Sequence, residues 1–132
     1  MTGKEVTIAE RMTKTPHLIG AEQSLKVAHD LMRKHQIRHL PVLHGGKLIG
    51  VVSERDLHLV ETLHDVDPAR VRVEEAMSQD VYAVTPKTPL KEVVREMAGR
   101  RLGSAVVVEG THVIGVFTTV DALETLAGVL SA

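Results

Sequence analysis

The sequence predicts an α+β fold made of two tandem β-α-β-β-α repeats, and three observations support this prediction. First, shifting the sequence by 65 positions aligns residues 6–56 with residues 71–121 without a gap, and 12 of the 51 aligned pairs are identical. Second, β-rich runs and amphipathic helical segments follow one another in the same order in both halves. Third, a half of roughly 60 residues is marginal alone, so we expect the two halves to share a core.

The first helix of each repeat is indicated by apolar residues spaced three and four apart. In the second copy these residues are Leu90, Val93, Val94 and Met97. Thr88 followed by Pro89 predicts an N-cap and a first helical position. We expect this helix to end near residue 99, and its counterpart in the first copy to end near residues 34–36.

A β-hairpin and a second helix complete each repeat. The β-rich runs are residues 37–43 and 47–52 in the first copy, and residues 102–108 and 112–117 in the second. Each pair is separated by a short turn that contains glycine, which is typical of a hairpin. The final helices are expected at residues 53–64 and 118–130.

The composition excludes several classes of function. The chain has one Tyr (Tyr82), one Phe (Phe117) and no Trp, so it lacks the aromatic platform that binds single-stranded nucleic acid. Its formal charge of −1 gives no basic excess for binding a phosphate backbone. Cysteine is absent and no apolar run approaches the ~20 residues of a membrane span. We therefore expect a soluble, cytoplasmic protein that binds neither nucleic acid nor membrane.

Each hairpin continues into its last helix through the spacing Gly-x-x-Ser/Thr-x-x-Asp, at residues 50–56 and 115–121. A hydroxyl residue followed three positions later by an acid is typical of a capping box, which needs no ligand. The motif also fits a nucleotide site, because it lies at a helix N-terminus, where unpaired N–H groups attract anions. The hydroxyl could then bind a phosphate and the carboxylate a ribose. The sequence alone leaves both interpretations open.

Six segments, taken in order, resemble the tandem CBS domain pair named after cystathionine β-synthase, also called a Bateman module. They are Arg-Met-Thr at 11–13, Ile-Arg-His-Leu-Pro-Val at 37–42, Gly-Val-Val-Ser-Glu-Arg-Asp-Leu at 50–57, Ala-Met-Ser at 76–78, Leu-Lys-Glu-Val-Val at 90–94 and Gly-Val-Phe-Thr-Thr-Val-Asp at 115–121. The resemblance implies two repeats, 5–64 and 71–130, joined by a linker at 65–70. It also implies that their sheets pack about a pseudo-two-fold axis and leave two clefts for AMP, ADP, ATP, NAD or S-adenosylmethionine.

The resemblance assigns roles to particular residues. Ser53 and Thr118 would contact phosphate, while Asp56 and Asp121 would hold ribose hydroxyls. The starts of the middle strands would offer backbone groups to the base, and the first strands would close the clefts. Four aliphatic residues would enclose the adenine: Leu18, Ile19, Ala83 and Val84. The other expected nucleotide-binding residues are Thr13, His17, Ile37, Arg38, His39, Pro41, Arg55, Ser78, Tyr82, Leu102, Gly103 and Ser104.

The two copies differ where charge matters. Thr119 and Val120 replace Glu54 and Arg55, and Val106 replaces Pro41. Because the first copy also has Arg38 and His39 near its motif, we expect phosphorylated ligands to bind more tightly there.

The predicted function is a regulatory module, in a stand-alone CBS-domain protein, that senses an adenosine-containing nucleotide and signals to an unidentified protein partner. It requires no cofactor. The alternative is a structural or interaction module with empty clefts. Catalysis and metal binding are not expected, since Ser53, Asp56 and His58 are merely adjacent in sequence and a helix end should separate His35 from His39. The apolar residues of the last helices, including Leu59, Leu63, Leu123, Leu126 and Leu130, predict a homodimer.

Overall fold

The computed structural model describes residues 5–132, and its mixed α+β architecture of two sheets and four α-helices confirms the predicted fold class. The helices are α1 (Leu25–His35), α2 (Glu54–His64), α3 (Leu90–Arg100) and α4 (Thr119–Ser131). The strands are β1 (Thr13–Lys14), β2 (Ile19–Gly20), β3 (His39–His44), β4 (Lys47–Ser53), β5 (Ala83–Val84), β6 (Ser104–Glu109) and β7 (His112–Thr118). Short 3-10 turns lie at Ile8–Glu10, Pro68–Arg70 and Val73–Glu75.

The chain forms two compact units that do not follow the sequence repeats. One unit is His17–Val81, and the other combines the segment before His17 with Tyr82–Ala132. The repeats therefore exchange their first segments: β1 pairs with β7 in the second unit, and Ser78 forms a bridge with Val51 in the first. The domain boundaries at 5–64 and 71–130 describe the repeat along the sequence, and as domain boundaries they stay a prediction.

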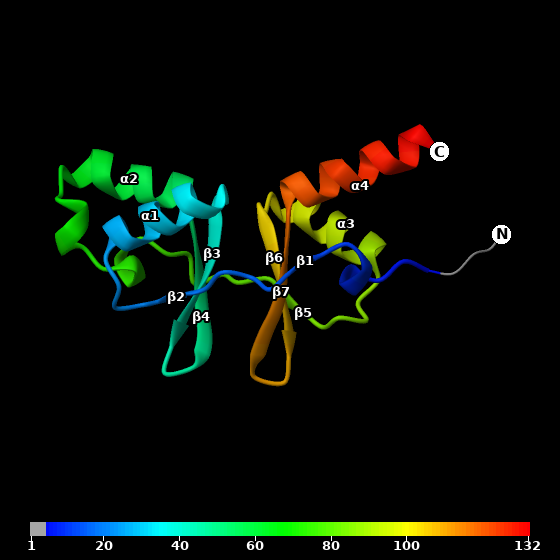
Figure 1. Cartoon of the computed structure of the whole chain (residues 1–132), viewed down its shortest axis with the longest axis horizontal. Helices are drawn as coiled ribbons and strands as arrows, with labels where there is room; N and C mark the ends of the chain where they lie inside the picture. Colours follow the sequence, from blue (N-terminus) through cyan, green and yellow to red (C-terminus); the bar gives the residue numbers. More distant parts are fainter. Residues whose placement is uncertain (1–4) are drawn as a thin grey trace. The chain divides into compact units, whose positions relative to one another are not determined.

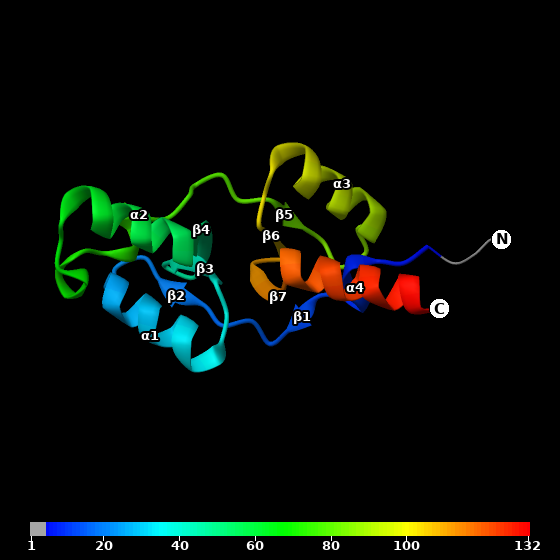
Figure 2. The same ribbon diagram turned by 90° about the horizontal axis from the view of Figure 1, so that it is seen from above.

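The unit of residues 17–81 has a sheet with the order β2-β3-β4, in which β2 is parallel and β4 antiparallel to β3. Helices α1 and α2 lie together on one face of this sheet (Figures 1 and 2). The fully buried side chains between them include Leu25, Leu40, Val52 and Leu57.

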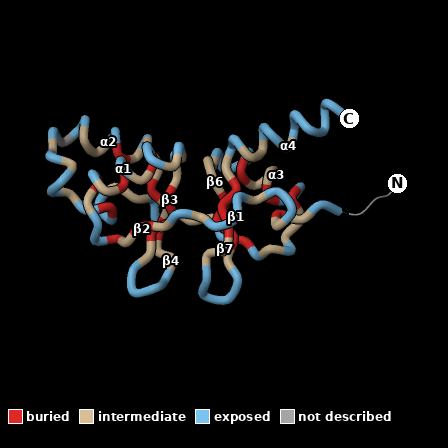
Figure 3. The backbone as a smooth tube through the Cα atoms, viewed as in Figure 1, coloured by how far each residue is buried: buried red, intermediate tan, exposed pale blue. Residues whose placement is uncertain are grey.

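The second unit repeats this arrangement and adds one strand. Its sheet has the order β1-β7-β6-β5, with α3 packed against β6 and α4 against β7 (Figure 1). Val93, Ala105, Val107 and Phe117 are fully buried in its core. Figure 3 shows the same pattern, with buried backbone concentrated in the strands of this unit.

The described residues form two core clusters, one in each unit, where the sequence predicted one shared core, and the exchanged segments complete both of them. Val73 from the second repeat is fully buried in the core of residues 17–81, and Ile8 from the first is fully buried in the other core. The helix starts are tied in the same way. The amide of Leu25 donates to the Val71 carbonyl at 2.9 Å, and the amide of Leu90 donates to the Val6 carbonyl at 2.8 Å.

The element boundaries confirm most of the predicted ones. Helices α1 and α3 end at His35 and Arg100, and each is followed by a residue in the left-handed conformation, Gln36 (φ 54°) or Arg101 (φ 56°). Strands β3 and β6 begin two residues later than predicted, because the preceding residues complete these helix ends.

The predicted cap of the second-copy helix was wrong. Pro89 occupies the N-cap position, and no side chain caps this helix. The helix start is stabilised instead by the backbone of the exchanged segment.

Helix α4 is largely exposed, and none of its residues is buried (Figure 3). Large apolar side chains stand exposed along it: Val120, Leu123, Leu126, Val129 and Leu130. None of the helices in the described part of the chain has both the length and the apolar character needed to cross a membrane.

Candidate functional site

The first strand-to-helix junction lies where β4 passes into α2. Ser53 has an extended backbone (φ −107°, ψ 162°) and is the N-cap of α2. Its Oγ accepts a hydrogen bond from the Asp56 amide at 3.0 Å, and the Asp56 Oδ2 accepts one from the Ser53 amide at 2.8 Å. The capping box that the sequence allowed is therefore formed. It uses Oδ2 of Asp56, and no hydrogen bond to Oδ1 is found among the described residues.

The second junction, where β7 passes into α4, has the same backbone geometry with Thr118 as the N-cap (φ −111°, ψ 172°). The Asp121 Oδ2 accepts from the Thr118 amide at 2.9 Å, and the Thr118 Oγ1 accepts from the Asp121 amide at 3.3 Å. In addition, the Thr13 hydroxyl lies 3.2 Å from both carboxylate oxygens of Asp121. The carboxylate of this junction is thus more fully occupied than that of Asp56.

The predicted binding residues separate into two groups, one in each unit. The unit of residues 17–81 holds His17, Leu18, Ile37, Arg38, His39, Pro41, Ser53, Arg55, Asp56 and Ser78. The other unit holds Thr13, Tyr82, Ala83, Leu102, Gly103, Ser104, Thr118 and Asp121. Segment exchange therefore brings Thr13 of the first repeat to the junction of the second, which the repeat pattern alone could not indicate.

The starts of the middle strands lie beside the junctions, but two of their carbonyls are already engaged. His39 pairs with Ser53, and Ser104 pairs with Thr118. The carbonyl of Arg38 accepts from the Glu54 amide at 2.9 Å, and that of Gly103 accepts from the Thr119 amide at 3.1 Å. These carbonyls, expected to face a base, instead stabilise the first turns of α2 and α4.

The first strands differ from the prediction. Between Thr13 and Leu18 only β1 is strand, and β2 starts at Ile19, while β5 starts at Ala83. Ile19 and Val84 are buried in the two cores, because successive side chains along a strand point to opposite faces. They are therefore not free to enclose an adenine, whereas Leu18 is half-buried and Ala83 is exposed.

His39 is a half-buried titratable residue that pairs with Ser53 across strands β3 and β4. Burial lowers the pKa of His39 most, Asp56 raises it and Arg38 lowers it further. The folded chain therefore favours the neutral imidazole. The stability that this provides is present above the ordinary histidine pKa and is lost as the pH falls through the lowered value.

The replacement of Pro41 by Val106 changes the hydrogen bonding of the first strands. The Val106 amide donates to the Tyr82 carbonyl at 2.9 Å. Pro41 occupies the matching position but has no N–H, so it cannot donate to the carbonyl of His17. Among the hydrogen bonds of residues 5–132, none to the His17 carbonyl is found.

Two further residues, which the sequence analysis did not assign to a site, contact predicted site residues. The ring of His35, at the end of α1, stacks on His17 with centroids 3.6 Å apart and planes inclined by 15°. The guanidinium carbon of Arg100, at the end of α3, lies 5.6 Å from the centroid of the Tyr82 ring. The available signal was the repeat itself, since the 65-residue shift pairs His17 with Tyr82 and His35 with Arg100.

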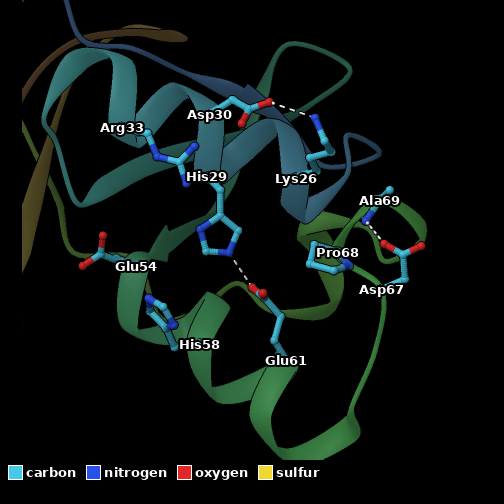
Figure 4. Close-up of a pocket in the computed structure, with 10 residues that line it drawn as sticks. All are labelled: Lys26, His29, Asp30, Arg33, Glu54, His58, Glu61, Asp67, Pro68 and Ala69. Atoms are coloured by element: carbon cyan, nitrogen blue, oxygen red, sulfur yellow. Dashed lines mark hydrogen bonds and ion pairs between the residues drawn. The ribbon is translucent and has the colours of Figure 1, made fainter.

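A polar pocket of about 690 Å³ lies between α1, α2 and the turn at residues 67–69 (Figure 4). His29 Nε2 lies 2.5 Å from Oε2 of Glu61, and the His29 ring meets the edge of His58 at a centroid distance of 5.7 Å. No cluster of three or more His, Asp or Glu residues in the described chain could hold a metal ion. The pocket contains none of the predicted nucleotide-binding residues.

The corresponding groove of the second unit, between α3 and α4, has a volume of about 580 Å³ and is apolar. The repeat places Val94, Leu123 and Leu126 where the polar pocket has His29, His58 and Glu61. The two units have thus kept their strand-to-helix junctions and diverged on their helical faces.

Comparisons with known proteins agree with this organisation. The chain is 33% identical, over 104 residues, to inosine-5'-monophosphate dehydrogenase of Korarchaeum cryptofilum; the match covers 78% of the chain and 21% of that enzyme. It therefore spans about a fifth of this much longer relative.

Two solved structures share the fold. A protein of Vibrio cholerae assigned to acetoin utilization, AcuB, superimposes with a TM-score of 0.85 and 29% identity, covering 97% of this chain and 95% of AcuB. The CBS domain pair of MJ0100, in complex with 5'-methylthioadenosine and S-adenosyl-L-methionine, also has a TM-score of 0.85, at 23% identity, covering 95% of this chain and 98% of the other.

The family model for the CBS domain matches the chain twice, at residues 4–60 and 73–128. These two matches coincide with the sequence repeat and contain both strand-to-helix junctions. The chain belongs to the CBS domain family and carries two CBS domains in tandem.

Proposed function

We propose that the chain is a regulatory module that binds an adenosine-containing nucleotide at its strand-to-helix junctions and signals through a change in conformation or association. The observation that carries this proposal is the twin geometry of Ser53 with Asp56 and of Thr118 with Asp121. Each junction presents a hydroxyl, a carboxylate and the positive end of a helix dipole, which together suit a phosphate and a ribose. The ligands of the MJ0100 domain pair, which contain adenosine, support the class of ligand.

The charges around the first junction favour a phosphorylated ligand there. Arg55 is exposed on the first turn of α2, and Arg38 is exposed at the start of the adjacent strand. The second junction has Val120 and Gly103 at the matching positions and offers no cation there. Because an arginine can bind phosphate oxygens through charge-assisted hydrogen bonds, we place the phosphate at Ser53 and Arg55.

A nucleotide panel tests this proposal in one experiment. We expect at least one of AMP, ADP, ATP, NAD and S-adenosylmethionine to raise the melting temperature of the full chain. A ligand present at 100 times its Kd stabilises a protein by about 2.7 kcal/mol, which shifts Tm by several degrees at this size. Guanosine and cytidine nucleotides are the matched controls. The proposal fails if none of the adenosine compounds shifts Tm or gives heat in calorimetry at millimolar concentration.

A second candidate function is an interaction module without a small-molecule ligand. The specific observation in its favour is that both capping boxes are complete, so Ser53 and Thr118 already have partners. Exposed apolar residues on α2 and α4 would then carry the function through binding of another protein or another copy.

Helices α2 and α4 carry exposed apolar residues, and we propose that the chain forms a homodimer through these two helices. Leu59 and Leu63 of α2 are 56% and 68% exposed, and Leu126 of α4 is 50% exposed. Exposed apolar side chains of this size, gathered on a helix, are normally covered by a partner. Light scattering should therefore give about twice 14.4 kDa at micromolar concentration.

The double variant Leu63→Glu with Leu126→Glu tests this homodimer. It should shift the chain toward the monomer, because it introduces charges into an apolar contact. Lys47→Glu is the control, since Lys47 is exposed at the opposite end of β4 from α2. A wild-type chain that remains monomeric at high concentration, with and without nucleotide, would exclude this association.

A further inference from the structure

The ends of α1 and α3 carry equivalent ring contacts of different chemistry. The 65-residue shift maps the stacked pair His17–His35 onto the pair Tyr82–Arg100. In both units, therefore, a residue shortly before the parallel strand, β2 or β5, contacts the last turn of the following helix, α1 or α3, through an aromatic ring. One contact joins two titratable imidazoles, and the other joins a phenol ring and a guanidinium.

The pair in the second unit carries a permanent positive charge. The guanidinium of Arg100 stays protonated at all ordinary pH values, and a cation within about 6 Å of a ring centroid is attracted to its face. Burial raises the pKa of Tyr82 most, and Glu96 and Glu92 raise it further, so the ring remains a neutral phenol. Arg100 also donates to Glu96 at 3.2 Å, which holds the guanidinium at this position.

The His17–His35 pair of the first unit carries a positive charge, as the Tyr82–Arg100 pair does, only when it binds a proton. Two imidazole rings with centroids 3.6 Å apart cannot both be charged without strong repulsion. The pair therefore binds one proton well before it binds a second. A protonated ring stacked on a neutral one then reproduces the cation–π contact of Tyr82 and Arg100.

The surroundings of the pair oppose that first proton. Burial lowers the pKa of His35 most, followed by His17 and Lys34. The other titratable or charged groups on the adjoining segments are Arg33 on α1, Arg38 and His39 at the start of β3, and Glu54, Arg55 and Asp56 at the start of α2. The repeat places Leu31 where the other unit has Glu96, so no carboxylate matches the one beside Arg100.

The His17–His35 pair lies in the same unit as the first strand-to-helix junction. Continuing the parallel register of β2 and β3, in which Ile19 pairs with Val42, places His17 level with Leu40. The next residue back along β3 is His39, which pairs with Ser53.

We propose that His17 and His35 form a proton-operated counterpart of the Tyr82–Arg100 contact, so that in mild acid the unit of residues 17–81 gains a further cation, besides Arg38 and Arg55, for its nucleotide site. Anionic nucleotides then bind this unit more tightly as the pH falls, while binding to the other unit changes little. This inference rests on the proposed function for its ligand, although the proton uptake itself can be measured without one.

The proton uptake is tested by NMR titration of the histidine ring signals in the full chain. We expect His35 to titrate below the ordinary histidine range, with a curve that depends on the His17 ring stacked against it. In the His17→Ala chain, His35 should titrate as a single group at higher pH. If His17 and His35 titrate independently in the wild type, each as an ordinary histidine, the proposal is overturned whatever the nucleotide results.

The effect on binding is tested with AMP by calorimetry at about pH 5.5 and about pH 8, which bracket the histidine range. The control is the double variant His17→Tyr with His35→Arg, which transplants the pair of the other unit and carries a permanent cation. Because the phosphate of AMP also titrates near pH 6, the comparison with this variant removes the contribution of the ligand.

For each chain we compare the AMP affinity at about pH 5.5 with that at about pH 8. We expect this ratio of affinities to be about three- to fivefold larger in the wild type than in the double variant, which is the size of one screened charge interaction. Equal ratios, with both chains folded and binding AMP, would refute the proton-operated contact and leave the proposed function intact. Absence of AMP binding to either chain at both pH values would overturn the proposed function and this inference with it.

Discussion

Gly50→Ala should destabilise the chain by about 2–3 kcal/mol, the cost of forcing an extra methyl group into a tightly packed position. A Cβ atom on Gly50 would lie 2.7 Å from the carbonyl oxygen of Ser78 and 2.6 Å from the sulfur of Met77. The Ser78 backbone cannot move away freely, because it exchanges two hydrogen bonds with Val51, at 2.8 and 3.0 Å. Thermal unfolding followed by circular dichroism should show a Tm lower by about 10 °C.

Two other glycines make this prediction specific. Gly115→Ala should cost less, because a Cβ there would meet mainly the flexible side chain of Met12, with the Thr13 carbonyl oxygen at 3.1 Å. Gly99→Ala should stabilise α3 by about 0.5–1 kcal/mol, since nothing lies within 4 Å of the added methyl group and alanine favours a helix. A Gly50→Ala chain as stable as Gly99→Ala would show that the exchanged segment does not pack on β4 as described.

The packing around these glycines also shows which features of the fold the sequence repeat could predict. The motif glycines, Gly50 and Gly115, recur at the same spacing, so the repeat pattern located both strand-to-helix junctions correctly. The reason for a glycine there, however, is the close approach of Ser78 and of Met12 with Thr13. Those residues lie in the other repeat, and hydrophobic periodicity within one repeat carries no information about which copy of a segment fills a given position.

The same limitation accounts for the wrong helix cap and for the misplaced strand residues. Thr88 followed by Pro89 is a sound local start signal, but Leu90 donates its amide to Val6, a partner 84 positions earlier in the chain. Ile19 and Val84 were expected to face a ligand, and burial against their own helices decided otherwise. Local patterns thus predicted the elements, while long-range contacts determined which faces remained available.

The His17–His35 stack shows a further limit of sequence reasoning. His17 was expected at the site because the resemblance to CBS domains places the first strand at the cleft, whereas His35 was considered only as half of a rejected metal pair. The stack between them depends on the exact end of α1 at His35 and on the left-handed conformation of Gln36. Boundaries of this precision are not accessible from periodicity, which locates helix ends only to within a few residues.

Asp56→Ala should weaken binding of an adenosine nucleotide by roughly 10- to 150-fold, because it removes a charge-assisted hydrogen bond worth about 1.5–3 kcal/mol. The same substitution also has a cost in stability. Asp56 Oδ2 accepts from the Ser53 amide at 2.8 Å, so its loss opens the capping box. A stability loss of about 1 kcal/mol should therefore accompany the loss of affinity.

Asp56→Asn separates the two effects. The asparagine keeps an oxygen that can accept from the Ser53 amide, so most of the stability should be retained, while the weaker neutral hydrogen bond to a ribose should still reduce affinity. Calorimetry and thermal unfolding on the same samples provide both quantities. Asp56→Ala with unchanged affinity and a lowered Tm would assign the carboxylate to capping alone and favour the interaction module without a ligand.

The matched variant Asp121→Ala ranks the two junctions. Both carboxylate oxygens of Asp121 already lie 3.2 Å from the Thr13 hydroxyl, and one of them also caps α4. Asp56 has one oxygen without such a partner in the described chain, and Arg55 lies next to it, so the larger loss of nucleotide affinity should follow Asp56→Ala. If Asp121→Ala causes the larger loss, the phosphorylated ligand binds mainly at Thr118, and the charge of Arg55 and Arg38 does not determine the preferred site.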